Sequence, residues 1–531
     1  MKKIIGLFIS AFLLSSGAVF AQGAMDAYKY SQNDIHGTAR YSSMAGAFGA
    51  LGGDISSMTT NPAGLGIYRS AEVVATMNLS FINTTANWTG INTDASRTKF
   101  NFDNIAYVGY FPTGSMEGVK SWNLGFAYNR VKNFNRNYTM RGNPNTSMAI
   151  YSAEKSYGLD VAGLRFRDGY NPYNNTALSG DWLSILGYNA GFHDVIPGKD
   201  DEYRSDFGRN SNGGWINYWA DESEMTVVEK GAIDRYDFSL ATNVSDRFFL
   251  GASLVLTDID YSQKTFYKED FGSIGDLYLN NYLSTEGAGY GLNVGAIVRP
   301  LDYLRLGVAY NSPTWYKITE YYHAKAGSFV DNRAEKEYKA ETPDDRIYYT
   351  EYELRTPDRW IFSAAGILGQ SALISVDYEL TNYKTMHLYD RNGLSMHGDN
   401  DKIKSYFGTS GILRVGTEYK VTPQFAIRAG AAWANSSVKD VLKNEEKEVF
   451  TAGTQTHYTV DDGTSYYTAG FGYRFTPNFY LDVACVYKEQ KESAFAFSKV
   501  YDNAGNLWAD SESAGLKTKT TRLAITLGYK F

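Results

Sequence analysis

The chain has 531 residues, 43% hydrophobic and 15% aromatic, with a formal net charge of −7 at pH 7. This mildly acidic balance offers no basic patch for a nucleic-acid partner. After its first residues the chain contains no run of 18 apolar residues, which excludes helical membrane spans. Its 43 Tyr, 29 Phe and 51 Gly, against 11 Pro, are typical of an aromatic, turn-rich all-β protein.

The first residues have the pattern of a secretory signal. Lys2 and Lys3 precede an apolar run from Ile4 to Leu14, and small residues follow up to Ala21. The run is too short to span about 30 Å of hydrocarbon, which argues against a membrane anchor. We therefore expect residues 1–21 to be a cleaved signal peptide.

Residues 22–70 show no alternation of apolar and polar side chains. They are rich in small residues, which let a backbone pack closely against a wall, and Asn61-Pro62-Ala63-Gly64 marks a fixed turn. The glycine spacing in this segment superficially suggests a phosphate loop. No strand–helix unit of a nucleotide-binding fold surrounds it, however, so we do not expect one.

From residue 71 onward, alternation with period 2 predicts about fourteen β-strands. We place them at 71–88, 100–111, 121–140, 232–243, 247–268, 285–299, 303–325, 345–367, 371–390, 404–420, 424–440, 463–475, 479–500 and 516–531. Tight turns alternate with longer polar loops, one of them at 269–284. Apolar faces toward lipid, polar faces toward a lumen and loops of unequal length are expected of a transmembrane antiparallel β-barrel. The prediction is an all-β, multi-pass barrel at 71–531 in a Gram-negative outer membrane.

The third strand contains a change of phase. Trp122, Leu124, Phe126 and Tyr128 keep one phase, whereas Val131 has the other. A phase slip is the signature of a β-bulge, either an ordinary one at a rim or one with a special role.

The longest connection, 142–231, is too long for a bare loop. Trp182, Leu183 and Leu186 form an apolar stripe on a short helix that begins after Asp181. We expect this segment to be an extracellular lid over the outer mouth, with these three residues as candidates for an outer groove.

Three arginines fall on the polar faces of predicted strands, namely Arg235, Arg414 and Arg522. On the lipid face each would cost about 2–4 kcal/mol at the bilayer midplane, so they should point into the lumen. There they could bind a carboxylate head group through charge-assisted hydrogen bonds. Alternatively, they pair with the lumenal carboxylates Asp377, Glu379 and Asp482.

The last strand, 516–531, alternates cleanly and ends on Phe531. In barrels of this type a terminal aromatic residue acts as a signal to the barrel-assembly machinery. The single cysteine, Cys485, lies on an apolar strand face, where it is expected to act as a small hydrophobe.

Two stretches resemble the FadL/TodX family of outer-membrane transporters for long-chain fatty acids and other hydrophobic compounds. The first is Ala39-Arg-Tyr-Ser-Ser-Met-Ala-Gly-Ala-Phe-Gly-Ala-Leu-Gly-Gly-Asp54 with Asn61-Pro62-Ala63-Gly64, which is similar to the N-terminal hatch of that family. The second is Leu354-Arg-Thr-Pro-Asp-Arg-Trp360 with Val376-Asp377-Tyr378-Glu379. The Ala-rich hatch is similar to that of Bacteroidetes-type members.

The resemblance implies that residues 22–70 form a hatch, or plug, in the lumen. It also implies passive uptake of fatty acids or similar molecules through an outer groove and a lumenal pocket. Exit is then lateral, through a gap in the third strand, which makes Asn129, Arg130, Val131 and Lys132 candidate gate residues.

Other functions stay open at this point. An outer-membrane scaffold for protein secretion or surface attachment, of the type IX kind, would share these features and would bind secreted or surface proteins. A haem receptor is a further alternative, although the six histidines are scattered without the spacing of paired axial ligands. No grouping of Ser, His and Asp and no zinc-ligand spacing indicates an enzyme, so neither a cofactor nor a metal is expected. The partners expected are a fatty-acid-like molecule and outer-membrane lipid.

Overall fold

A computed structural model describes residues 23–531, apart from 116, 208–218, 332–336, 344–348, 370, 450, 452, 502–506 and the side chain of Trp508. The predicted signal peptide, 1–21, lies outside the described residues. None of the helices in the described part of the chain is long and apolar enough to cross a membrane.

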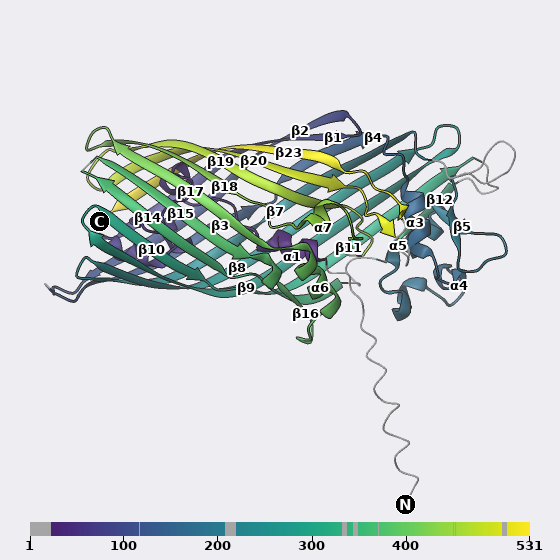
Figure 1. Ribbon diagram of the computed structural model, residues 1–531, viewed down its shortest axis with the longest axis horizontal. Coiled ribbons are helices and arrows are strands. Elements are labelled where there is room, and N and C mark those ends of the chain that lie inside the picture. The colour runs from purple at the N-terminus through teal and green to yellow at the C-terminus, as the bar shows by residue number, and fades with distance from the viewer. Residues whose placement is uncertain are drawn as a thin grey trace, which may run out of the picture.

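Fourteen antiparallel strands close into a barrel, which confirms the predicted fold class (Figure 1). The barrel is closed by β1 (Glu72–Trp88), which pairs with β23 (Ala514–Lys530). Between them the wall runs through β2 (Ile91–Pro112), β3 (Val119–Asn133), β7 (Glu222–Val244), β8 (Phe248–Asp270), β9 (Gly275–Leu301), β10 (Leu304–Asn311), β14 (Arg359–Leu368), β15 (Ala372–Asn382), β17 (Thr409–Lys420), β18 (Phe425–Ala434), β19 (Tyr458–Arg474) and β20 (Phe479–Phe495).

Five further strands continue this wall: β4 (Arg136–Gly142), β11 (Trp315–Val330), β12 (Glu337–Glu341), β13 (Tyr349–Arg355) and β16 (His387–Asp390). They lengthen the wall at the end of the barrel away from the C-terminus (Figure 1). The predicted loop 269–284 is wrong, because β8 and β9 stay paired up to Asp270 and Asp276 and only a tight turn joins them.

Alternation along each strand separates a lipid face from a lumenal face. In β8, Leu250, Leu254 and Leu256 are exposed on the outside, whereas Val255 and Ile259 are buried inside. Only the lipid-facing side chains of each strand need to be apolar, so the chain as a whole has a low mean hydropathy.

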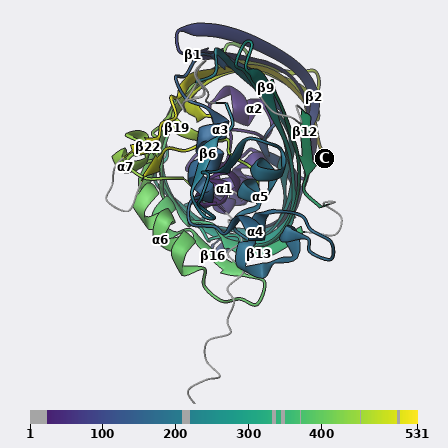
Figure 2. The ribbon, with the colours of Figure 1, turned by 90° about the vertical axis from the view of Figure 1, so that its right-hand side faces the viewer.

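The connections differ at the two ends of the barrel. At the end that carries the C-terminus the strands are joined by short turns, and at the other end a cap of helices and hairpins covers the mouth (Figure 1). The cap includes α3 (Met148–Ser156), α4 (Val161–Leu164), η3 (Pro172–Asn174), η4 (Thr176–Leu178), α5 (Trp182–Asn189), β5 (His193–Val195), β6 (Tyr203–Ser205), β21 (Val500–Tyr501) and β22 (Leu507–Ala509). The connections between β15 and β19 carry η5 (Tyr383–Thr385), α6 (His397–Tyr406) and α7 (Asp440–Lys443), and α6 and α7 lie at the side of the barrel (Figures 1 and 2).

The segment 23–70, called the hatch below, lies inside the ring of strands (Figure 2). It folds as α1 (Ala24–Ser31), α2 (Ala39–Ser43), η1 (Ile55–Thr59) and η2 (Pro62–Ile67), and most of its residues are buried. Each of the last three begins with a side-chain cap, as Asn61 caps η2 by accepting a hydrogen bond from the Ala63 N–H at 3.1 Å.

Glycines on the lumenal face let the hatch approach the wall. A Cβ atom on Gly295 would lie 2.0 Å from Asn61 Oδ1, and one on Gly251 would lie 2.4 Å from the Pro62 carbonyl carbon. The alternation of small and apolar residues in these strands is therefore a consequence of close packing between the hatch and the wall.

Candidate functional site

A cavity that is partly open to solvent lies between the hatch and the barrel wall. Its apolar lining includes Met25 and Tyr28 of α1, Ile82 of β1, Phe134 and Tyr458. We call it the first cavity. Because α1 lines one side of it, the position of the hatch determines its shape.

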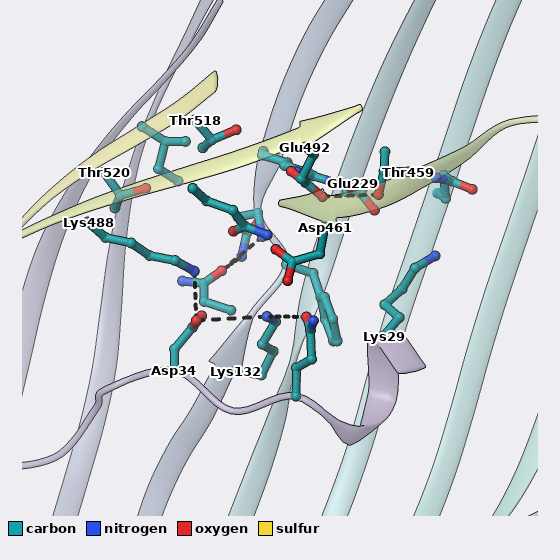
Figure 3. Close-up of a pocket in the computed structure, with 18 of the residues that line it drawn as sticks. Lys29, Asp34, Lys132, Glu229, Thr459, Asp461, Lys488, Glu492, Thr518 and Thr520 are labelled. Atoms are coloured by element: carbon teal, nitrogen blue, oxygen red, sulfur yellow. Dashed lines mark hydrogen bonds and ion pairs between the residues drawn. The ribbon is translucent and has the colours of Figure 1, made fainter. Parts of the chain in front are cut away.

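The first cavity also has a strongly charged lining (Figure 3). Arg136 bonds both Glu229 and Glu492, and Lys29 lies 3.3 Å from Asp26. A lining that combines aromatic rings with ion pairs suits a molecule with an apolar part and a polar part better than a pure hydrocarbon.

One carboxylate of the first cavity, that of Asp461, has no ion-pair partner among the described residues. It accepts hydrogen bonds from the Tyr28 hydroxyl at 3.1 Å and from the Gly463 N–H at 3.3 Å. Tyr28 itself stacks on Phe407 with ring centroids 4.7 Å apart, which holds α1 against the cap side of the lumen.

A second cavity lies on the other side of hatch residues 32–36. It is lined by Arg235, Arg359, Glu379 and Arg414, among others. Hatch residues Gln32, Asp34, Ile35 and His36 line both cavities, so this short segment separates them.

The three predicted lumenal arginines point into the lumen, and each has a partner. Arg235 bonds Asp237 at 2.6 Å, and Arg414 bonds Glu379 at 2.6 Å. Arg522 donates to the Ile35 carbonyl at 2.5 Å and to His36 Nδ1, so it binds the hatch to the wall. Arg522 lines the first cavity, and the other two line the second.

His36 lies against Arg522, and its Nδ1 atom is also 3.4 Å from the Asp103 carboxylate, which favours the protonated ring. Burial, and then the neighbouring guanidinium, lower the pKa of its imidazole below the ordinary value. A neutral ring can accept the hydrogen bond from Arg522 at Nδ1, with the proton on Nε2.

The wall is irregular at the predicted gate residues. The β2–β3 ladder ends at Asn104 and Asn129, and the pairing of β3 with β7 shifts between Arg130 and Lys132. Beyond this point the outer half of β2 has no ladder partner in β3 or β4 among the described pairings.

Phe134 lies in the break between β3 and β4 and turns inward. Its ring is 4.8 Å from that of Tyr261 and 6.3 Å from that of Tyr30 in α1, measured between centroids. Residues 133–136 all line the first cavity. The break in the wall and the cavity beside the hatch are therefore adjacent.

The residues of the hatch motif contact the wall. The Asn61 side-chain amide donates to the Gly49 carbonyl at 2.6 Å and to the Ala296 carbonyl at 3.3 Å, and Ala63 is fully buried beside Phe249. Asn61 to Gly64 line neither of the two cavities. Their contacts are those of an anchor.

The proposed outer-groove residues lie on α5, as the sequence indicates, but mostly within the cap. Trp182 is buried against Tyr173 and Tyr322, and Leu186 is fully buried. Leu183 is half-buried. None of the three lines either of the two cavities.

Sequence reasoning named Lys132 as a gate residue but missed Asp34, Lys488 and the ion pairs that join them across the lumen. Asp34 of the hatch meets Lys132 of β3 and Lys488 of β20, which are far apart in the chain. Their only signal in the sequence is a charged residue on a lumenal face, which does not reveal its partner. The role of the second family-like stretch was also missed: Arg359 donates to the Ser31 carbonyl at 2.7 Å, and Asp377 accepts from the Gly49 N–H at 2.8 Å.

Comparison with known proteins adds to this geometry. Residues 237–531 match the family described as outer membrane protein transport protein (OMPP1/FadL/TodX). No curated protein matches the chain. Among solved structures, a FadL homologue from Pseudomonas aeruginosa is 14% identical, with a TM-score of 0.50, over 94% of this chain and 99% of that one.

Two toluene transporters are also similar over 94% of this chain and 99% of theirs. TodX of Pseudomonas putida is 11% identical with a TM-score of 0.47, and TbuX of Ralstonia pickettii is 13% identical with a TM-score of 0.48. At these sequence identities, structural similarity supports the fold alone. The match to the P. aeruginosa protein supports it.

Proposed function

The chain belongs to the OMPP1/FadL/TodX family of outer-membrane transport proteins, and from that premise we propose that it takes up long-chain fatty acids or similar amphiphiles passively. The family and the fold support the transport of hydrophobic molecules by an outer-membrane β-barrel. The substrate and the route are the parts that we propose.

The observation that carries the proposal is the contact between the first cavity and the break in the wall. Residues 133–136 line the cavity, and the β2–β3 ladder ends beside them. A molecule held next to α1 is therefore close to a place where the wall lacks ladder hydrogen bonds, and the hatch lies inside the ring of strands (Figure 2).

Energetics favour a lateral exit over an axial one. An apolar tail that dropped straight into the periplasm would be exposed to water at about 0.8 kcal/mol per CH₂. For a tail of about sixteen carbons the cost is on the order of 13 kcal/mol. A route between β2 and β3 into lipid avoids this cost, so we assign the gate to Asn129–Lys132 and the adjoining break.

Deletion of Val131 tests this route, because it removes the extra residue at which the β3–β7 register shifts. We expect the ladder to become regular and uptake of labelled palmitate by whole cells to fall to the level of cells without the protein. Heat-modifiable migration on gels should show that the barrel still assembles.

Unchanged uptake by a folded deletion variant would contradict the lateral gate. Undetectable uptake by the unaltered protein, present in the outer membrane at normal levels, would instead contradict the transport of fatty acids.

A further inference from the structure

The carboxylate of Asp34 is bound in the lumen in the way a ligand would be. Its Oδ1 atom accepts hydrogen bonds from Lys488 Nζ at 2.6 Å and from the Tyr466 hydroxyl at 3.1 Å, and Lys132 Nζ lies 3.8 Å away. Lys132 pairs with Asp34 by charge and donates its hydrogen bond to Gln32 Oε1 at 3.3 Å. The three side chains come from β20, β19 and β3, so the wall supplies the site and the hatch supplies the anion.

The site requires a negative charge. The Asp34 side chain is 10% exposed, and those of Lys132 and Lys488 are 10% and 16% exposed. Burial by itself would raise the pKa of the Asp34 carboxyl, but the two ammonium groups hold it well below its usual range. Two partly buried ammonium groups at one point would repel each other if no anion lay between them.

The same residues are accessible from the cavities. Asp34, Lys132, Tyr466 and Lys488 line both the first and the second cavity. A molecule in the first cavity can therefore approach these donors from beside the hatch.

Asp34 also joins the hatch to the irregular strand. Its backbone N–H donates to the Val131 carbonyl at 2.8 Å, at the point where the β3–β7 register shifts. A movement of the Asp34 carboxylate away from the two lysines would therefore also disturb the hydrogen bond between the hatch and the proposed gate.

We propose that Lys132, Lys488 and Tyr466 form a carboxylate-binding site, which Asp34 occupies at rest and which the head group of an amphiphilic ligand occupies during transport. The inference rests on the proposed function and names its substrate class as alkyl carboxylates. Ligand binding displaces Asp34 and weakens the contact between the hatch and Val131, which couples recognition of the head group to opening of the wall.

Binding of dodecanoate and dodecanol to the purified full-length protein in a non-ionic detergent tests the site by calorimetry. Asp34→Asn removes the competing charge with little change in shape, so we expect dodecanoate to bind about tenfold more tightly and dodecanol to change by less than twofold. Lys488→Met should weaken dodecanoate about tenfold and spare dodecanol. In the double variant, the gain from Asp34→Asn should be lost.

Lys317→Met is the matched control, because this lysine is 85% exposed on the outside of β11. It should leave the binding of both compounds unchanged. Folding of every variant is checked by heat-modifiable migration, and Asp34→Asn tests the inference even if Lys488→Met does not assemble.

The outcomes separate the inference from the function on which it rests. If the unaltered protein binds both compounds and Asp34→Asn leaves the preference between them unchanged, the carboxylate site is wrong and transport stands. If the unaltered protein binds neither compound, the proposed function is wrong and the inference falls with it.

Discussion

Single lumenal side chains hold the hatch at points spread around the wall. Arg522 donates to the Ile35 carbonyl and Arg359 to the Ser31 carbonyl, and Asp377 accepts from the Gly49 N–H. That an arginine on a polar strand face points inward can be predicted from the cost of exposing it to lipid. Its partner cannot, because the partner is brought to it by barrel closure and by the path of the hatch.

At the same scale, Gly295 tests the fit between hatch and wall. In Gly295→Ala the new Cβ would lie 2.0 Å from Asn61 Oδ1, so the Asn61 side chain must leave its place against the wall, and we expect η2, which it caps, to loosen. We expect an assembled barrel with at least a severalfold higher ionic conductance in planar bilayers.

Gly366→Ala is the matched control, because its Cβ would meet no atom closer than 3.5 Å. Equal conductance in both variants and the unaltered protein would mean that η2 does not seal the lumen.

His457 makes the outer end of the barrel sensitive to acid. Its ring bonds the Phe495 carbonyl and the Tyr138 hydroxyl, each at 2.6 Å, and burial lowers its pKa to about 4. Because the carbonyl can only accept, Nδ1 carries the proton of the neutral ring. The unfolded chain, with an ordinary pKa of about 6.5, binds this proton first, so stability is full above pH 6.5 and is lost as the pH falls toward 4.

We therefore expect the thermal midpoint of the unaltered protein to fall between pH 7.5 and pH 4.5 by more than that of His457→Gln. The loss from this one group is at most about 3 kcal/mol, at 1.36 kcal/mol per pKa unit. Parallel pH profiles for the two proteins would show that the ring does not titrate in this way.

At the scale of elements, the sequence predicts the existence of the strands better than their boundaries. The fourteen strands follow from alternation, but β8 and β9 extend through the predicted loop 269–284, because their outer halves pair with each other in spite of polar outward faces. The slip in β3 could be seen in the phases of Tyr128 and Val131. That Phe134 would turn onto α1 could not, because α1 is remote in the sequence.

The packing of the cap can be tested at helix α5. Trp182 is 5% exposed and packs against Tyr173 and Tyr322 at ring-centroid distances of 4.9 and 5.4 Å. Trp182→Ala should cost about 3–5 kcal/mol locally. We expect faster amide hydrogen exchange in α5 and in the β5–β6 hairpin, with exchange in β1 and β23 unchanged.

Leu183→Ala, at a half-buried position on the same helix, should have a clearly smaller effect. If Trp182→Ala left exchange in the cap as slow as in the unaltered protein, the cap would not depend on this packing.

The molecule as a whole has a closed wall, a cap at one end and a hatch in the lumen (Figures 1 and 2). The first cavity lies beside the break between β3 and β4. Barrel and membrane location could be predicted from composition, alternation and turn lengths. The charged character of the cavity could not, since its lining is assembled from the hatch and from strands at both ends of the chain.

The most direct test of the central claim is photo-crosslinking with palmitate that carries a diazirine on its tail, followed by mass spectrometry of the labelled peptides. The account predicts label on the lining of the first cavity, at Phe134, Ile82 and Met25, and its loss in the presence of excess palmitate. Label confined to outward-facing residues such as Leu254 and Leu292, with no competition, would contradict it.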